Sequence, residues 1–289
     1  MWGVEISAHI DALARDGALL ADAAEAAGLR AVIPGCPGWQ VRDLVRHQAY
    51  VHDWAARHVR DRSPELIDDG ITEPGILGRG PADADLIAAY RDGHAALVAT
   101  LRDADPDLAC ATFMPAPSPL AFWARRQAHE TAIHRYDAQS AAVAGPPRPA
   151  DAFDPAFAAD GVDELIMGFA ARRRYRPRDG SGGGSLTVCA HDAERAWHIR
   201  LPTPRPVGPD IPAGTHSTAN TADTHGTADT AVSRLDGRDD PPADCTLEGP
   251  AAGLYAFLWN RSDAARSGLT ITGRPEVLAG WGANVRVRW

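Results

Sequence analysis

The chain has 289 residues, of which 45% are hydrophobic, and a formal net charge of −9. That length favours two modest cores over a single large one. The acidic balance argues against nucleic acid as a partner, because phosphate binding needs a basic face. There is no apolar run of about 18 residues to span a membrane and no basic N-terminal export segment, so we expect a cytoplasmic protein without a membrane partner.

The first half of the chain is predicted to be a helical bundle. Apolar residues recur at helical spacing in several segments, and connections rich in Pro, Gly or polar residues separate them. The longest connection, 61–80, is polar and contains four glycines, which predicts a loop. Four helices with a long second-to-third connection indicate a four-helix bundle over residues 1–145. The predicted helices cover residues 4–27, 41–60, 83–101 and 123–137.

The fourth predicted helix carries the densest chemistry in the chain. Glu130, His134 and Asp137 are spaced i, i+4 and i+7, so they share one stripe of the helix. A carboxylate and an imidazole one turn apart can hold a divalent metal if another helix adds a ligand. His129 lies about 140° around the helix from His134 and cannot share that metal. Taken alone, the pattern fits surface salt bridges and a core histidine equally well.

The second predicted helix offers a third ligand. His47 follows Leu44 by three residues and precedes Val51 by four, so it lies on the apolar face that points into the bundle. His52 lies about 140° around the same helix from His47. We therefore expect His52 to be structural, with contact to a bound substrate or cofactor as the alternative.

Two motifs resemble the mycothiol-dependent maleylpyruvate isomerase family. They are Cys-Pro-Gly-Trp-x-Val-Arg-Asp-Leu-Val-x-His at 36–47 and Arg-x-x-His-Glu-Thr-Ala-Ile-His-Arg-Tyr-Asp-Ala at 126–138. The family belongs to the DinB/YfiT-like metal-binding bundles of actinobacteria. The resemblance implies one divalent metal, usually zinc, bound by His47, Glu130 and His134.

The resemblance also bears on neighbouring residues. It implies that Asp137 supports the metal ligands or contacts the thiol cofactor. Histidine and carboxylate ligands leave Ni, Fe and Mn open as alternatives to zinc. Family members often have Ser or Thr where this chain has Gln40, a weaker helix cap that costs about 1 kcal/mol.

The second half of the chain is predicted to be a small α/β domain. Residues 146–184 form a connecting helix and a Gly-rich linker, and 185–289 form the domain, with a mobile polar loop at about 203–242. The glycine run is not a phosphate loop, because no Gly-Lys-Ser/Thr follows it. Within the domain we expect strands at 185–191, 195–200, 245–248 and 269–272, and helices that open at Pro250 and Pro275.

The predicted fold class is therefore α+β, with a DinB-like four-helix bundle followed by a C-terminal α/β domain. The C-terminal half resembles the family's sterol-carrier-like domain, which implies an arginine over the metal cleft. Arg261 is the first candidate for that arginine and Arg274 the second.

The resemblance implies an enzyme that activates mycothiol, a low-molecular-weight thiol, against a small electrophilic substrate. An arginine across the cleft would hold the substrate's carboxylate. Isomerase and S-transferase would use the same residues, so both remain open. The expected partners are the thiol and a small-molecule substrate, and the protein would be a monomer or weak dimer. The alternative is an apolar-ligand-binding protein with a tunnel in 185–289 and a structural metal site closed by a fourth protein ligand.

Overall fold

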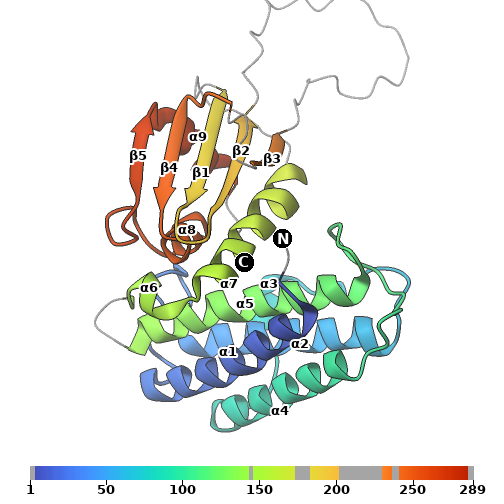
Figure 1. The fold of residues 1–289 in the computed structure, drawn as a ribbon. Helices are drawn as coiled ribbons and strands as arrows, with labels where there is room; N and C mark the ends of the chain where they lie inside the picture. Colours follow the sequence, from blue (N-terminus) through green and yellow to red (C-terminus); the bar gives the residue numbers. More distant parts are fainter. Residues whose placement is uncertain (1–3, 143–145, 173–182, 202–229, 236–240, 286–289) are drawn as a thin grey trace, which may run out of the picture.

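The computed structural model describes residues 4–142, 146–172, 183–201, 230–235 and 241–285. These residues form a helical bundle followed by a mixed five-stranded sheet with helices, which is the predicted α+β class (Figure 1). No helix in these ranges is long and apolar enough to cross a membrane.

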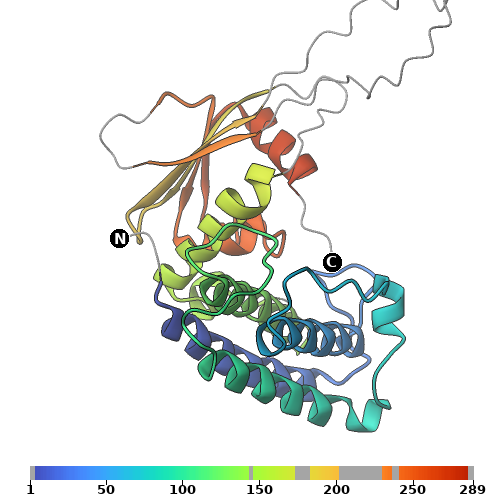
Figure 2. The same cartoon turned by 90° about the vertical axis from the view of Figure 1, so that its right-hand side faces the viewer.

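Four long helices lie side by side and form the bundle (Figures 1 and 2). The four predicted helices are confirmed, with α1 packed along α5 and α2 along α4. The predicted loop at 61–80 needs a correction, because it contains the short helix α3 (Glu73–Leu77). Pro74 in its first turn favours helix, but five residues are too few for an apolar period to show in the sequence. The long helices are α1 (Ile6–Ala27), α2 (Val41–Arg60), α4 (Asp83–Arg102) and α5 (Pro119–Ala142).

The start of α2 is stabilised by a residue three positions beyond the expected weak cap. The Asp43 carboxylate accepts a hydrogen bond from the backbone N–H of Gln40 at 2.8 Å. This bond satisfies one of the free donors at the helix start and places a negative charge near the positive end of the helix dipole. This capping interaction fixes the start of the helix that carries the predicted ligand His47.

Helix α5 is buried along nearly its whole length and has no solvent-facing side. It lies between α1 and α2 on one side and the C-terminal helices on the other (Figure 2). Burial of unpaired charge is costly, so each charged side chain of α5 needs a partner. Arg135, for example, forms an ion pair with the buried Asp16 of α1 at 3.0 Å.

The chain leaves the bundle through α6 (Pro149–Ala152) and α7 (Pro155–Asp163). The connecting helix predicted within 146–184 is present as α7, and the chain continues beyond it with a different helical geometry. A π-helical turn, Glu164–Phe169, and a 3₁₀ turn, Ala170–Arg172, follow. This segment carries Glu164 and Phe169, which both contact Arg126 of α5.

The C-terminal sheet has strand order β3-β2-β1-β4-β5. Strand β1 pairs antiparallel with β2 and parallel with β4. Helix α8 (Ala251–Leu258) lies between the sheet and the bundle, and α9 (Pro275–Asn284) ends the described chain (Figures 1 and 2). Both proline-opened helices and the four predicted strands are confirmed. The strands are β1 (Gly184–Ala190), β2 (Arg195–Leu201), β3 (Ala231–Leu235), β4 (Cys245–Gly249) and β5 (Thr270–Gly273).

Strand β3 corrects the prediction of a mobile loop at 203–242. Among the described strands it pairs with β2 alone, and most of its side chains lie outside the core, so its sequence shows no apolar alternation. Arg234 anchors it through an ion pair with the buried Asp163 at 2.7 Å. Most of the rest of that predicted loop, 203–229 and 236–240, and most of the glycine run lie outside the described residues.

One apolar cluster runs through both halves of the protein. It joins Leu13 and Trp123 of the bundle to Val188, Trp197 and Tyr255 of the C-terminal unit, by which we mean the described residues from Pro155 onward. A continuous core fixes the two halves against each other, so side chains from α7 and α8 reach α5 at defined positions.

Candidate metal centre

The described residues contain three buried groups of side chains that could hold a metal ion. Within each group the ligating atoms all lie within 4.8 Å of one another. The groups are His47 with Glu130 and His134, Cys36 with His134 and Asp137, and His9 with His129 and Asp160.

The first group combines the three side chains predicted as ligands. Nε2 of His47 lies 3.1 Å from Oε1 of Glu130, and Nε2 of His134 lies 3.4 Å from the same oxygen. All three residues are buried. Helix α2 contributes one of these side chains and α5 contributes two, so the cluster depends on the packing of these two helices.

Asp137 determines which nitrogen of His134 faces this cluster. Its carboxylate lies 3.0 Å from Nδ1 of His134. Burial would raise the pKa of Asp137, but Arg261 and His134 lower it to about 2, so the carboxylate can only accept and Nδ1 must donate. Burial would lower the pKa of His134, but its hydrogen bonds with Asp137 and Glu130 raise that pKa, so without a metal a proton on Nε2 faces Oε1 of Glu130. A divalent ion bound to both atoms would take the place of this proton.

The two oxygens of Glu130 have different partners. Oε2 accepts a hydrogen bond from Nη2 of Arg126 at 2.8 Å, whereas Oε1 faces the histidines and Nε2 of Gln48 at 3.3 Å. Burial would raise the pKa of Glu130, but its bonds with His134 and His47 and the Arg126 charge hold that pKa well below its usual value. The carboxylate is therefore ionised and offers one oxygen to a cation.

The other two groups place an arginine on the oxygen that would bind a metal. Arg261 donates to Oδ2 of Asp137 at 2.9 Å, and Arg125 donates to Oδ2 of Asp160 at 2.8 Å. A guanidinium at these oxygens already supplies the positive charge and repels a dication. The donor set of His47, Glu130 and His134 is the one that fits a divalent ion, through two imidazoles and one carboxylate.

His129 belongs to the third group and not to the metal cluster. Its Nε2 lies 2.9 Å from Asp160, which also receives Nε2 of His9 at 3.0 Å. Its Nδ1 lies 3.2 Å from the hydroxyl of Tyr255. This network ties α1, α5, α7 and α8 together, and it explains why the two histidines of α5 serve different partners.

Arg261 reaches the site through Asp137, and Arg274 does not reach it. Arg261 binds the Asp137 carboxylate through Nε and Nη2, and its Nη1 donates to the Trp259 carbonyl at 2.9 Å. Arg274 lies at the start of α9, largely exposed, 3.6 Å from Asp244. Of the two candidate arginines, the structure brings only Arg261 to the predicted site residues.

His52 lies in the core of the bundle. Its Nε2 lies 2.9 Å from the hydroxyl of Thr131, and its ring packs against Tyr90 and His94. Burial lowers its pKa to about 3, so the ring is neutral. The structure does not bring His52 to the metal cluster.

Cys36, the first residue of the 36–47 motif, lies against the site. Its thiol donates to Oδ2 of Asp137 at 3.3 Å and accepts from Nη2 of Arg261 at 3.3 Å. Burial, followed by the Asp137 charge, raises its pKa, so it remains a neutral thiol.

Several other contacts were not predicted, although their positions in the motifs give some indication. The Trp39 ring packs against both imidazoles of the cluster, with its centroid 5.2 Å from that of His47 and 6.1 Å from that of His134. Gln48 follows His47 directly, and Arg126 precedes Glu130 by one helical turn, so both lie near the predicted stripe. No sequence signal indicates Glu164, which pairs with Arg126 from 38 residues away.

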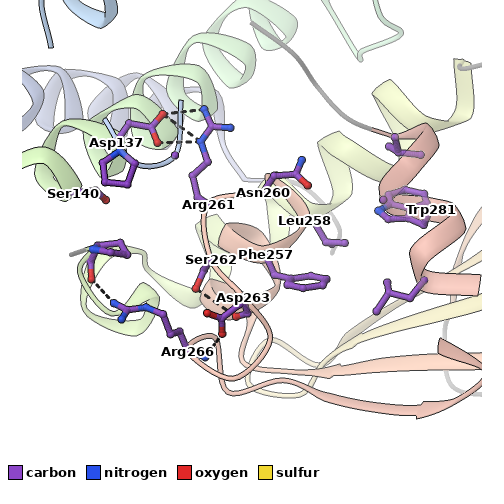
Figure 3. A pocket seen from close by; sticks show the side chains of 16 residues that line it. Asp137, Ser140, Phe257, Leu258, Asn260, Arg261, Ser262, Asp263, Arg266 and Trp281 are labelled. Atoms are coloured by element: carbon purple, nitrogen blue, oxygen red, sulfur yellow. Dashed lines mark hydrogen bonds and ion pairs between the residues drawn. The ribbon is translucent and has the colours of Figure 1, made fainter. Parts of the chain in front are cut away.

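A pocket of about 420 Å³ adjoins Asp137 at the junction of the two halves (Figure 3). Figure 3 shows the Asp137–Arg261 pair on its wall, together with Asn260, Arg266 and Trp281. The wall mixes charged, amide and hydroxyl groups with apolar ones, so it suits a ligand that is partly polar. Its apolar residues include Pro34, Pro146, Phe257, Leu258, Leu278 and Val285.

Comparisons with known proteins match both halves of the chain to domains of one family. The model of the mycothiol maleylpyruvate isomerase N-terminal domain matches residues 10–139, and that of the MDMPI C-terminal domain matches 156–280. A crystal structure of a mutant mycothiol-dependent maleylpyruvate isomerase aligns with TM-score 0.59 and 12% identity over 99% of this chain and 98% of that one. The structure described without a mutation aligns with TM-score 0.56, at the same identity and coverage. A search of curated proteins gave no match.

Proposed function

The chain belongs to the mycothiol maleylpyruvate isomerase family, and from this we propose a metal-dependent enzyme that activates a low-molecular-weight thiol against a small electrophilic substrate. The observation that carries the proposal is the geometry at Glu130. Its Oε1 faces Nε2 of His47 and of His134, while Arg126 holds Oε2. In the other two buried groups an arginine binds the ligating oxygen itself.

A divalent ion at this position, zinc first among the candidates, would lower the pKa of a bound thiol and favour the nucleophilic thiolate. The protein's own residues prepare the site. Asp137 orients His134 through the Nδ1 hydrogen bond at 3.0 Å. Trp39 covers both imidazoles and keeps that side of the cluster dry.

The nucleophile has to come from outside the chain. Cys36 is the cysteine nearest the cluster, but burial raises its pKa and holds it as a neutral thiol. Within the described residues, Cys110, Cys189 and Cys245 belong to none of the three metal-binding groups. These observations, with family membership, favour an imported thiol such as mycothiol.

The pocket beside Asp137 is the proposed site for the polar part of the thiol or for the substrate. Hydroxyl and amide groups of a sugar-linked thiol would find partners in Asn260, Asp263 and Arg266. A substrate carboxylate would compete with Asp137 for Arg261. Isomerisation with release of the thiol and net thiol transfer would both use these residues.

The apolar-ligand alternative predicts a tunnel within residues 185–289. The pocket instead takes walls from the segment after α1, the end of α5 and the C-terminal helices, and charged side chains line it. Both halves of the protein contribute walls to this pocket, and it lies beside the proposed metal cluster. This arrangement favours an enzyme over a carrier of apolar ligands.

The test is metal analysis of the purified protein combined with calorimetric titration of the metal-loaded form with mycothiol, and with glutathione as control. We expect one divalent ion per chain and tighter binding of mycothiol. Equal affinity for the two thiols, or none for either, would remove the mycothiol assignment. A protein that binds no ion would remove the metal-dependent enzyme as well.

A further inference from the structure

Arg126 lies between the metal ligand Glu130 and the C-terminal unit. Its Nη2 donates to Oε2 of Glu130 at 2.8 Å, and its Nη1 donates to the carboxylate of Glu164. All three side chains are buried. One guanidinium therefore bridges a carboxylate of the bundle and a carboxylate from the segment that leads into the sheet.

Two aromatic rings hold the plane of this guanidinium. The Cζ atom of Arg126 lies 5.3 Å from the Phe169 ring centroid and 5.4 Å from that of Trp259. A cation packed against aromatic faces is stabilised, and this packing keeps the planar guanidinium from rotating away from the two carboxylates. Both rings come from the C-terminal unit.

The π-helical turn explains how Glu164 and Phe169 reach the same arginine. In an α-helix, residues five apart lie about 140° from each other around the axis. The i→i+5 repeat of a π-helix brings such residues close to one face. The turn spans Glu164–Phe169, so its first and last residues both contact Arg126.

This arrangement limits what Glu130 can offer to a metal. With Oε2 bonded to Arg126, only Oε1 faces the two histidines. A carboxylate that binds through both oxygens occupies two positions around an ion, whereas one that binds through a single oxygen leaves a position for another ligand.

We propose that Arg126 is a positioning residue that makes Glu130 a one-oxygen metal ligand, and that the C-terminal unit holds Arg126 in place through Glu164, Phe169 and Trp259. The C-terminal unit thereby controls how an ion is coordinated in the bundle. This inference rests on the proposed metal centre.

The experiment compares Co²⁺ binding by the full-length wild type and by the double variant Arg126→Met/Glu164→Gln. The double change removes the cation and one of the two carboxyl groups that it bridges, so fewer buried charges lose their partner than in Arg126→Met alone. We expect Co²⁺ affinity, measured by chelator competition, to fall about 10- to 100-fold. We also expect weaker visible absorption bands, because Glu130 can then bind through both oxygens and raise the coordination number.

Arg125→Met is the matched control. Arg125 is the preceding residue on α5 and pairs with the buried Asp160 and Asp163, but it touches no residue of the metal cluster. Its loss should lower the melting temperature and leave the Co²⁺ affinity and spectrum unchanged. A purely structural role for Arg126 predicts the same behaviour in both variants.

If circular dichroism shows that the double variant does not fold, the single variants Glu164→Gln and Arg126→Lys are measured in its place. Lysine retains the charge but lacks the planar fork that bridges two carboxylates. We expect an altered Co²⁺ spectrum in each. If the folded variants showed the wild-type Co²⁺ affinity and spectrum, the inference would be overturned, but the proposed metal centre would stand. A wild type that binds no Co²⁺ would overturn both.

Discussion

The carboxylate of Asp137 lies 3.0 Å from Nδ1 of His134 and holds the opposite nitrogen of that ring toward Glu130. The same carboxylate binds Arg261, so Asp137 stands between the metal cluster and the pocket. Oriented carboxylates of this kind fix the tautomer of a metal-binding histidine and raise its basicity.

Asp137→Asn should therefore weaken metal binding about 10- to 100-fold, and it should also lower the melting temperature, because the buried Arg261 loses its anionic partner. The amide can no longer act as an anionic acceptor for both His134 and Arg261. Zinc affinity by chelator competition measures the effect. Asp263→Asn is the control, because Asp263 lines the same pocket without contacting His134. Equal zinc affinity in wild type and Asp137→Asn would contradict the orienting role.

His47→Ala should remove the metal and leave the bundle folded. His47 is the one member of the cluster from α2, and the stability of that helix comes from its apolar packing. Metal content and far-UV circular dichroism decide the outcome. His58→Ala is a control on the same helix, since His58 bonds the Trp54 carbonyl and belongs to none of the metal-binding groups. Full metal occupancy in His47→Ala would show that α2 supplies no ligand.

The sequence was sufficient for the parts of the protein that have a local period. The i, i+4 and i+7 spacing placed Glu130, His134 and Asp137 on one stripe, and all three lie together in the structure. Apolar alternation predicted four of the strands, and prolines at helix starts predicted α8 and α9, because each of these signals lies within a few residues.

What the sequence could not give depends on contacts between distant residues. Arg126 and Glu164 are separated by 38 residues, and His9 and Asp160 by 151. A pattern along the chain shows that Arg126 lies near the stripe, but not which carboxylate will face it after folding. Strand β3 was missed for a related reason, because an edge strand gains its order from β2 and from the Arg234–Asp163 pair.

Asp163 should contribute far more to stability than Arg234, although the two side chains form one ion pair. Asp163 is buried and accepts from Arg125, Trp197 and Arg234. Asp163→Asn should cost about 3 to 5 kcal/mol, because a buried carboxylate that accepts from three donors is replaced by an amide whose NH2 group cannot accept from them. The Arg234 side chain is 40% exposed, so Arg234→Gln should cost about 1 kcal/mol or less. Urea unfolding measures the free energy of unfolding of both variants, and equal losses of stability would contradict the argument from burial.

His52 should make the protein less stable in mild acid. Burial lowers its pKa from 6.5 to about 3, so between these values the unfolded chain binds a proton that the folded chain does not. The stabilisation is present in full above pH 6.5 and is lost as the pH falls, by about 2 to 3 kcal/mol down to about pH 4.5.

The measurement is the difference in unfolding free energy between wild type and His52→Gln across this range, with both proteins free of metal. A difference is needed because burial raises the pKa of Glu164 to about 7, despite the charges of Arg126 and Arg125, and this carboxyl acts in the opposite direction. The variant should show the shallower decline on acidification. His191→Gln, at an exposed position, is the control. Parallel curves for His52→Gln and wild type would refute the prediction.

Arg266→Ala should weaken thiol binding without changing metal affinity. Arg266 is exposed, lines the pocket and donates to the Pro146 carbonyl at 2.5 Å, so its loss disturbs neither the core nor the ligands of the cluster. A charged donor to a polar ligand contributes about 1.5 to 3 kcal/mol, which corresponds to roughly a tenfold or greater rise in Kd for mycothiol. Arg102→Ala, a surface arginine paired with Asp11 at 2.9 Å, is the matched control. Calorimetry on zinc-loaded proteins measures the thiol affinity, and chelator competition measures the zinc affinity. If Arg266→Ala bound mycothiol as tightly as wild type, the polar part of the thiol would not lie beside Arg266. If the variant lost zinc, thiol binding in the pocket and metal binding in the cluster would not be independent, contrary to what we predict from their separate contacts.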